Sequence, residues 1–273
     1  WYGKKIKSFT VGLVAALFVG THPYLIQLSA RGLRDSAFTF IITVFVYLLF
    51  ETDLKRFRNK IAIFLSGAFA IYLRLHSLIQ LMGLSLIFVI AKRNIKQSVM
   101  LILALFLIAW PLILTNLTIY HIWNYSEEMH WKWNANVEFA GRPGFPSKEE
   151  MTINPFQGPK ISATTYFFKL HTLPDLIISS LAGVRKAFED LYFRDNWFGL
   201  VLFIAGGYLM LRNKSLWYIP VLVFFLEIPH FFLVAKNLVE FRSMTHSLPL
   251  IALTIGFAID KIIATIRKEI KNI

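Results

Sequence analysis

SVMLILALFLIAWPLILT, residues 98–115, contains no charged side chain. Its length approaches the roughly 20 apolar residues that a helix needs to cross a bilayer. The whole chain has the same character, because 56% of its 273 residues are hydrophobic and the mean hydropathy is +0.56. Soluble domains of ordinary composition are much less apolar. We therefore predict an all-α, polytopic membrane protein.

Apolar segments separated by basic loops predict about eight membrane helices. They cover residues 8–22, 36–50, 61–73, 77–91, 98–115, 197–211, 215–234 and 245–262. Several are short for a span, so they either extend into polar flanks or line a cavity as half-helices. The pair 61–73 and 77–91 is also compatible with one long bent helix, which would move the rest of the chain to the other side of the membrane.

The net charge of +13 comes from Lys and Arg in short clusters between the apolar segments. A nucleic-acid-binding protein would gather these cations on one soluble face, whereas loops on the cytoplasmic side of a membrane are rich in them. The orientation with the fewest cations in short outer loops places both ends of this chain inside. We expect a multi-pass protein of the plasma membrane that binds no nucleic acid.

This topology divides the chain into membrane helices at 1–115, an extracytoplasmic region at 116–196, and membrane helices with a basic tail at 197–273. The outer region contains Trp123, Trp131 and Trp133 and two Gly- and Pro-rich stretches, so it should form an ordered, aromatic-rich cap. Residues 173–191 have apolar side chains at helical spacing. They predict an amphipathic helix that lies on the outer membrane surface or packs on the cap.

Several site chemistries find no support in the sequence. The chain has no cysteine, which excludes disulfides, thiolate metal sites and cysteine nucleophiles. Its seven histidines show no ligand pair at the spacing of a zinc motif, and there is no Gly-rich phosphate loop and no G-x-S-x-G motif. The chain begins at Trp1 rather than at Met, and we expect that an N-terminal part is missing.

The cations that face outward in this topology are the exception to the charge rule. They lie near the outer ends of different helices, where a bundle can bring them together around a phosphate or diphosphate, which guanidinium groups bind in a bidentate way. A lipid-linked phosphate has its head group at this depth. Alternatively, each of these side chains reaches the lipid head groups independently. The candidates are Arg31, Arg34, Arg74 and Arg242 for the lipid phosphate, with His76 and Lys236 as cavity residues.

Two acidic residues are further candidates. Asp35 opens the apolar segment 36–50, where a carboxylate can cap the helix or bind a divalent cation, Mg²⁺ or Mn²⁺, beside a phosphate. Glu227 lies in an apolar segment with Pro229 and His230, so it either lines a cavity or makes a structural contact with His230 one turn on.

Five stretches together resemble membrane glycosyltransferases of the GT-C superfamily, in particular the family 39 relatives of protein O-mannosyltransferases and aminoarabinose transferases. The likeness covers most of the chain, and the third stretch carries most of it. The stretches are LSARGLRDSAFTF (28–40), SGAFAIYLRLHSLIQLMGLSLIFV (66–89), NANVEFAGRPGFPSKEE (134–150), YFFKLHTLPDLIISSLAGV (166–184) and EFRSMTHSLPLIALTIGFAI (240–259).

The resemblance implies an enzyme that moves a sugar from a polyprenyl-phosphate donor to a protein, glycan or lipid acceptor on the extracytoplasmic face. In such enzymes the principal acidic residue lies in a first outer loop, and we expect that this chain begins beyond that loop. A second acidic position matches Asp35, which is therefore our catalytic candidate. The arginine before the final helix, which contacts the lipid phosphate in relatives, matches Arg242, although Ser243 stands where relatives often have an aromatic residue.

Alanine at either Asp35 or Arg242 is predicted to abolish transfer without loss of expression. Two other functions remain open at this point. A transporter or flippase of a lipid-linked anion would also use outer arginines, but the two halves show no matching interrupted helices. A non-catalytic subunit of a larger membrane complex is the other.

Overall fold

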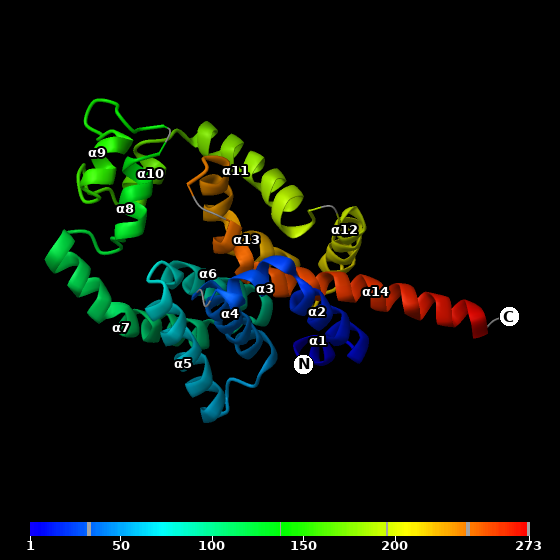
Figure 1. Ribbon diagram of the computed structural model, residues 1–273. Coiled ribbons are helices and arrows are strands. Elements are labelled where there is room, and N and C mark those ends of the chain that lie inside the picture. The colour runs from blue at the N-terminus through cyan, green and yellow to red at the C-terminus, as the bar shows by residue number, and fades with distance from the viewer. Residues whose placement is uncertain (32–33, 137, 195, 239–240, 272–273) are drawn as a thin grey trace.

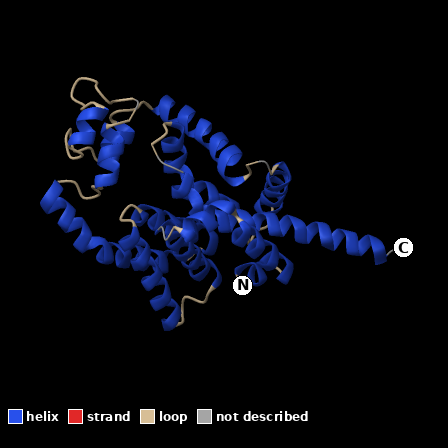
Figure 2. Cartoon of the chain, viewed as in Figure 1, coloured by secondary structure: helices blue, strands red, loops and turns tan. Residues whose placement is uncertain are grey.

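The protein consists of helices joined by turns and loops in the computed structural model, which describes residues 1–31, 34–136, 138–194, 196–238 and 241–271 (Figure 2). No strand occurs within these ranges. The predicted all-α class is therefore confirmed.

The helices of the first part of the chain follow one another through short connections. Their bounds are α1 Tyr2–Ile6, α2 Phe9–Thr21, α3 Pro23–Ala30, α4 Arg34–Glu51, α5 Phe57–Leu73, α6 Ser77–Lys92 and α7 Ile95–Tyr120.

Short helices and then longer ones make up the rest. The bounds are α8 Glu127–Asn134, α9 Lys148–Ile153, α10 Ala163–Phe168, α11 Leu173–Ala187, the π-helix η1 Phe188–Tyr192, α12 Trp197–Leu211, α13 Tyr218–Ala235, the 3₁₀-helix η2 Phe241–Ser247 and α14 Leu248–Lys271.

Three described helices are long and apolar enough to cross a membrane, namely α7, α13 and the run from Ser243 to Lys271. The pair α2 and α3, bent by 56° at the junction, forms a fourth candidate. Helices α6 and α12 are apolar but have only 16 and 15 residues, which is short for a simple span. The membrane character is thus supported, whereas the expected number of eight spans is not confirmed.

Segments 61–73 and 77–91 belong to two separate helices, α5 and α6. The chain leaves α5 at Arg74, which has an extended backbone, and re-enters a helix at Ser77. The Ser77 amide donates to the Arg74 carbonyl at 2.9 Å, so the connection is a tight turn. The alternative of one long bent helix is wrong.

The core of the helical body lies where α4, α6, α13 and the first half of α14 meet. Backbones approach closely at two glycines. A Cβ at Gly206 of α12 would overlap the Thr254 carbonyl of α14, and one at Gly183 of α11 would overlap the Phe231 carbonyl of α13. Small residues allow this close packing of helices in a membrane, where lipid is as apolar as the side chains.

Helices α8 to α10 and their loops form the cap, residues 121–172, which lies beside the end of α13 (Figure 1). Trp133 stacks on Tyr166 with ring centroids 5.2 Å apart, and both rings are buried. Phe232 and Leu233 of α13 belong to the same apolar cluster. The cap therefore shares its core with α13.

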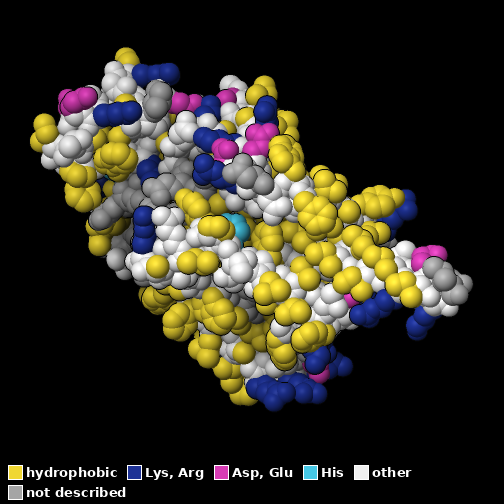
Figure 3. Space-filling view, turned by 45° about the vertical axis from the view of Figure 1, so that its right-hand side comes forward, with side chains coloured by type: hydrophobic (Ala, Val, Ile, Leu, Met, Phe, Trp, Pro, Cys, Tyr) yellow, Lys and Arg dark blue, Asp and Glu magenta, His cyan; other side chains and the backbone are white. Residues whose placement is uncertain are grey.

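Helix α11 leads away from the cap and packs along α13 (Figure 1). It leaves Leu173, Ile178 and Leu181 about two-thirds exposed, each at 65% or more. Figure 3 shows hydrophobic side chains over much of the helical body, with Lys and Arg gathered at its lower edge, at the protruding end and around the cap. This distribution is expected for a protein whose apolar band faces lipid.

Candidate functional site

Polar side chains from four elements meet where α4 and α6 begin. Asp35 lies in the first turn of α4, Arg74 follows α5, Glu227 and His230 lie on α13, and His246 belongs to η2. All five are buried, in a body whose surroundings are mostly apolar. Ionisable groups in such a place normally pair with one another or bind a ligand.

Asp35 and Arg74 form a buried ion pair. The side chain of Arg74 reaches the Asp35 carboxylate with its Nη2, and the residues are 9% and 4% exposed, respectively. The guanidinium also lies over the Phe38 ring, 4.9 Å from its centroid. Asp35 is thus held by a cation from a separate helix end, in addition to its favourable place in the first turn of α4.

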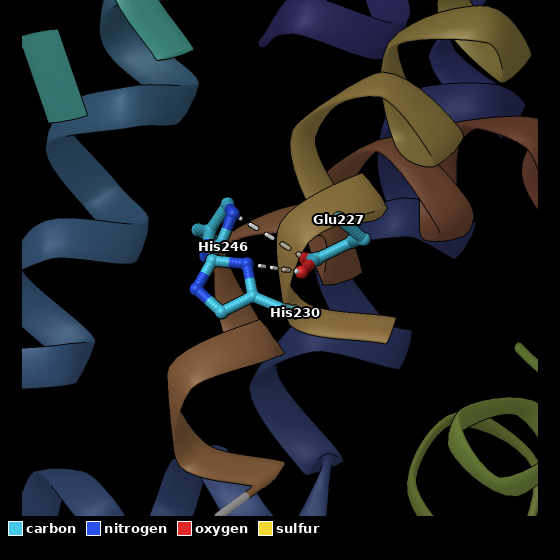
Figure 4. Close-up of side chains that lie close together, drawn as sticks. All are labelled: Glu227, His230 and His246. Atoms are coloured by element: carbon cyan, nitrogen blue, oxygen red, sulfur yellow. Dashed lines mark ion pairs between the residues drawn. The ribbon is translucent and has the colours of Figure 1, made fainter. Parts of the chain in front are cut away.

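Glu227, His230 and His246 form a second group beside the first (Figure 4). His230 Nδ1 lies 3.2 Å from one carboxylate oxygen of Glu227, and His246 Nε2 lies 3.4 Å from the other. Glu227 and His230 share a face of α13 because they are three residues apart. His246 comes from η2, which packs against both α13 and α4.

Side chains of α4 and α6 connect the two groups. The Phe38 ring lies edge-on to His246 at 5.5 Å and under Arg74. Gln80 Nε2 donates to the Leu226 carbonyl at 3.0 Å and lies 3.3 Å from His246 Nε2. The ring of His76, at the start of α6, is 6.5 Å from that of His230. The ion pair and the histidine group therefore form one continuous site.

The other predicted phosphate ligands lie at different distances from this site. Arg34 is the first residue of α4 and is close enough to His76 for an electrostatic interaction between the two side chains. Arg31 is exposed at the end of α3. The side chain of Arg242 lies outside the described residues, but its backbone belongs to η2, where Thr245 Oγ1 is 3.0 Å from Thr39 Oγ1 of α4. The structure thus brings Arg74 to Asp35 and packs η2 against α4 one turn after Asp35.

Lys236 belongs to a separate ionic cluster at the end of α13. Its Nζ donates to Glu138 of the cap at 2.5 Å and to Asp175 of α11 at 3.1 Å. His171 Nε2 lies 3.2 Å from the same Glu138 carboxylate. The lysine predicted as a cavity residue therefore joins the cap, α11 and α13 instead.

Acid should weaken this junction. Burial alone would raise the pKa of Asp175, but hydrogen bonds from Lys236 and Ser179 lower it below the ordinary 3.8. The contribution of Asp175 to the stability of the junction is complete above pH 3.8 and is lost as the pH falls through the lower pKa of the folded state. Burial alone would lower the pKa of Lys236, but Glu138 and Asp175 raise it above 10.5, so its contribution is lost only in stronger base.

We therefore expect amide hydrogen exchange in the cap and in α11 to become faster relative to the intrinsic rate at the same pH, that is, less protected, once the pH drops below about 3.8. Lys236→Met should show this faster exchange already at neutral pH. Arg185→Met, which alters an exposed ion pair with Glu189, is the matched control. Equal protection in Lys236→Met and the wild type would contradict the assigned role of Lys236.

An apolar groove also borders α4. It is bounded by α1, α2, α3, α4 and the start of α14, and its volume is about 610 Å³, within the range of roughly 300–1,000 Å³ typical of small-molecule sites. Small side chains of α2 line it, and Ser36 and Thr39, one and four residues after Asp35, line it on α4. Its α2 lining includes Gly12, Ala15, Ala16 and Gly20.

The sequence missed His246 and the groove. His246 lies 16 residues beyond His230, so no ligand motif of local spacing contains it. The small residues of α2 were a usable signal, because they recur at helical spacing on one face.

No family model, curated protein or solved structure matches this chain.

Proposed function

We propose that this chain forms the membrane-embedded part of a GT-C-type glycosyltransferase. It moves a sugar from a polyprenyl-phosphate donor to an acceptor on the extracytoplasmic face of the plasma membrane. The observation that carries this proposal is the buried Asp35–Arg74 pair, which lies next to an apolar groove on the same helix.

The reaction needs a base for the acceptor hydroxyl and positive charge for the departing phosphate. The acceptor oxygen attacks the anomeric carbon, the bond from that carbon to the phosphate oxygen breaks, and the acceptor proton passes to Asp35. The prenyl phosphate leaves with the bonding electrons. Arg34, Arg74 and Arg242 stabilise it, and Arg31 binds it nearer the surface.

Arg74 has two anionic partners in this scheme. Before the donor binds, its guanidinium pairs with Asp35. A donor phosphate competes for the same planar fork, because guanidinium binds phosphate and carboxylate with similar geometry. Binding of the donor thus releases the Asp35 carboxylate to act as base, and Arg34, Arg242 or a divalent cation at Asp35, Mg²⁺ or Mn²⁺, balances the negative charge that the phosphate adds.

The groove suits the prenyl chain of the donor. Its lining is mainly apolar, and it follows α4 from Thr43 to Ser36, the residue that comes directly after Asp35 in the chain. A polyprenyl phosphate is an extended apolar chain with one anionic end. The apolar lining of the groove suits the chain, and the end at Ser36 suits the phosphate. The acceptor enters from the cap side.

We assign the side of the membrane from the direction of α4, taking it as a span. The helix runs from Asp35 to Glu51 and is followed by the basic residues Lys55, Arg56, Arg58 and Lys60. Basic loops face the cytoplasm, so the Asp35 end faces outward, and both chain ends are cytoplasmic in the same scheme.

A transfer assay with the full-length protein tests the function. The protein is placed in vesicles with a panel of polyprenyl-phosphate sugars, and mass spectrometry follows prenyl phosphate release and sugar incorporation into added acceptors. We expect stoichiometric release and incorporation for at least one donor. Movement of the intact donor across the bilayer without transfer would identify a flippase instead, and inactivity with every donor, even with partner subunits present, would overturn the enzyme.

Filling the groove should discriminate between donors by chain length. Ala16 is exposed on the groove side of α2, and Ala16→Trp adds bulk there. We expect its KM for a long-chain donor to rise about tenfold, equivalent to about 1.4 kcal/mol, while a donor with a short prenyl chain reacts normally. Leu107→Trp, on the exposed face of α7, is the control. An equal effect on both donors would show that the groove does not hold the chain.

A further inference from the structure

We infer that Glu227, His230 and His246 bind one divalent transition-metal ion. This inference is independent of the proposed transferase activity, because it concerns binding alone. Each residue offers one ligand atom, a carboxylate oxygen or an imidazole nitrogen, and all three atoms lie within 4.8 Å of one another. A single ion at the centre of such a triangle can reach all three.

The three residues are deeply buried. Glu227 is 0% exposed, His246 is 1% exposed and His230 is 6% exposed. A carboxylate in this position is unfavourable unless its charge is compensated. A cation between the three side chains supplies that compensation.

The contacts within the group are close but are not hydrogen bonds. Both carboxylate oxygens of Glu227 and Nδ1 of His230 lack a hydrogen-bond partner among the described residues. Tyr192 interacts with Glu227, but its hydroxyl is bonded to Ser247 Oγ at 2.7 Å and to the Met244 carbonyl at 3.2 Å. Three buried ligand atoms thus face one point.

The donor set selects the class of metal. Two imidazoles and one carboxylate suit Zn²⁺, Fe²⁺, Co²⁺ or Mn²⁺, whereas Mg²⁺ and Ca²⁺ prefer oxygen ligands alone. Three protein ligands leave at least one coordination position for water or a ligand, as in zinc sites with two histidines and one glutamate. His76 is exposed at the start of α6, and its ring lies 6.5 Å from that of His230.

Gln80 supports the site from outside the ligand set. Its Nε2 is held by the Leu226 carbonyl, next to Glu227, and lies beside the His246 ring. This contact is with His246 Nε2, the nitrogen that also faces Glu227, so the ion would replace it while the bond to Leu226 keeps the Gln80 amide beside the site. Because His246 belongs to η2, the ion would also fasten η2, which contains Arg242, to α13.

Metal analysis of the full-length protein tests the inference. The detergent-solubilised protein is stripped with EDTA, dialysed against Zn²⁺ or Co²⁺ in the presence of excess Mg²⁺, and analysed by plasma mass spectrometry. We expect one Zn²⁺ or Co²⁺ per chain, visible ligand-field absorption from bound Co²⁺, and no displacement by Mg²⁺.

Variants locate the ion. Glu227→Gln and His246→Gln keep the size and polarity of the side chains, and each should lower the metal content at least tenfold. His121→Asn is the matched control, because His121 is exposed and its left-handed backbone (φ 59°) is tolerated by asparagine. X-ray absorption at the zinc edge of the wild type should show two imidazoles, a readout that does not depend on how the variants fold. Less than one-tenth of an ion per wild-type chain, or full occupancy in both variants, would overturn the site.

Discussion

Asp35→Asn combined with Arg74→Gln is expected to leave the protein folded and to reduce sugar transfer by about 10³-fold. The double variant replaces a buried ion pair by two neutral amides, a change that is often close to neutral for stability. It also removes the base and a phosphate ligand, and general base catalysis alone typically contributes 10²- to 10⁴-fold.

The single variants behave differently because both residues are buried. Asp35→Ala leaves the Arg74 guanidinium without its carboxylate partner, a loss that typically costs about 3–5 kcal/mol. The expectation from sequence alone, that Asp35→Ala leaves expression intact, changes accordingly. We now expect a lower yield of Asp35→Ala and a normal yield of the double variant.

The matched control lies at the other end of the same helix. Glu51→Gln with Tyr218→Phe removes a polar contact between α4 and α13 far from Asp35. Thermal unfolding in detergent and transfer rates are measured for both double variants. Normal transfer by Asp35→Asn/Arg74→Gln would show that the pair is structural and would remove Asp35 and Arg74 from the chemistry.

Arg242→Ala should lower the transfer rate by at least 10²-fold. Removing one preorganised donor to a developing negative charge typically has an effect of 10²- to 10³-fold. The side chain of Arg242 lies outside the described residues, but η2, to which its backbone belongs, packs against α4, and we therefore propose Arg242 as a ligand of the same site. Arg242→Lys keeps the charge but loses the planar fork, so we expect an intermediate rate.

Steady-state kinetics distinguish the two roles that Arg242 can have. A phosphate ligand of the ground state alone would change KM with kcat unchanged, whereas stabilisation of the departing phosphate lowers kcat as well. Arg212→Ala is the control, since Arg212 directly follows α12 and its guanidinium lies over the Tyr208 ring of the same helix. A wild-type rate in Arg242→Ala would remove this residue from the site and with it one of the positions that carry the resemblance.

The metal site and the transferase site make separable predictions. Loss of metal from Glu227→Gln with normal transfer would give the ion a structural role in holding η2. Loss of both would place the ion in the reaction. Transfer by a protein that binds no metal would leave the function standing and remove the ion.

Local physics was enough to predict the class of the protein and most of its helices. The uncharged run at 98–115 lies inside α7, and the charges at Asp35 and in the loop 52–56 delimit α4. In an apolar medium every backbone amide and carbonyl must be bonded within its own segment, so apolar runs form helices whatever their neighbours are. The bent pair α2–α3 was not predicted, because the expected segment covers only residues 8–22, whereas a second helix begins directly at Pro23, a residue favourable in the first turn of a helix.

The pairing of helix ends depends on packing between segments far apart in the chain. Which cation meets Asp35, and that His246 joins Glu227 and His230, follow from the way η2 and α6 fit against α4 and α13. Those fits depend on shape, for example on the space that Gly83 leaves for the Phe225 ring. Hydropathy and charge patterns contain no information about such shapes. They could therefore suggest candidate residues for a phosphate site, but only the packing of the helices decides which of these residues meet.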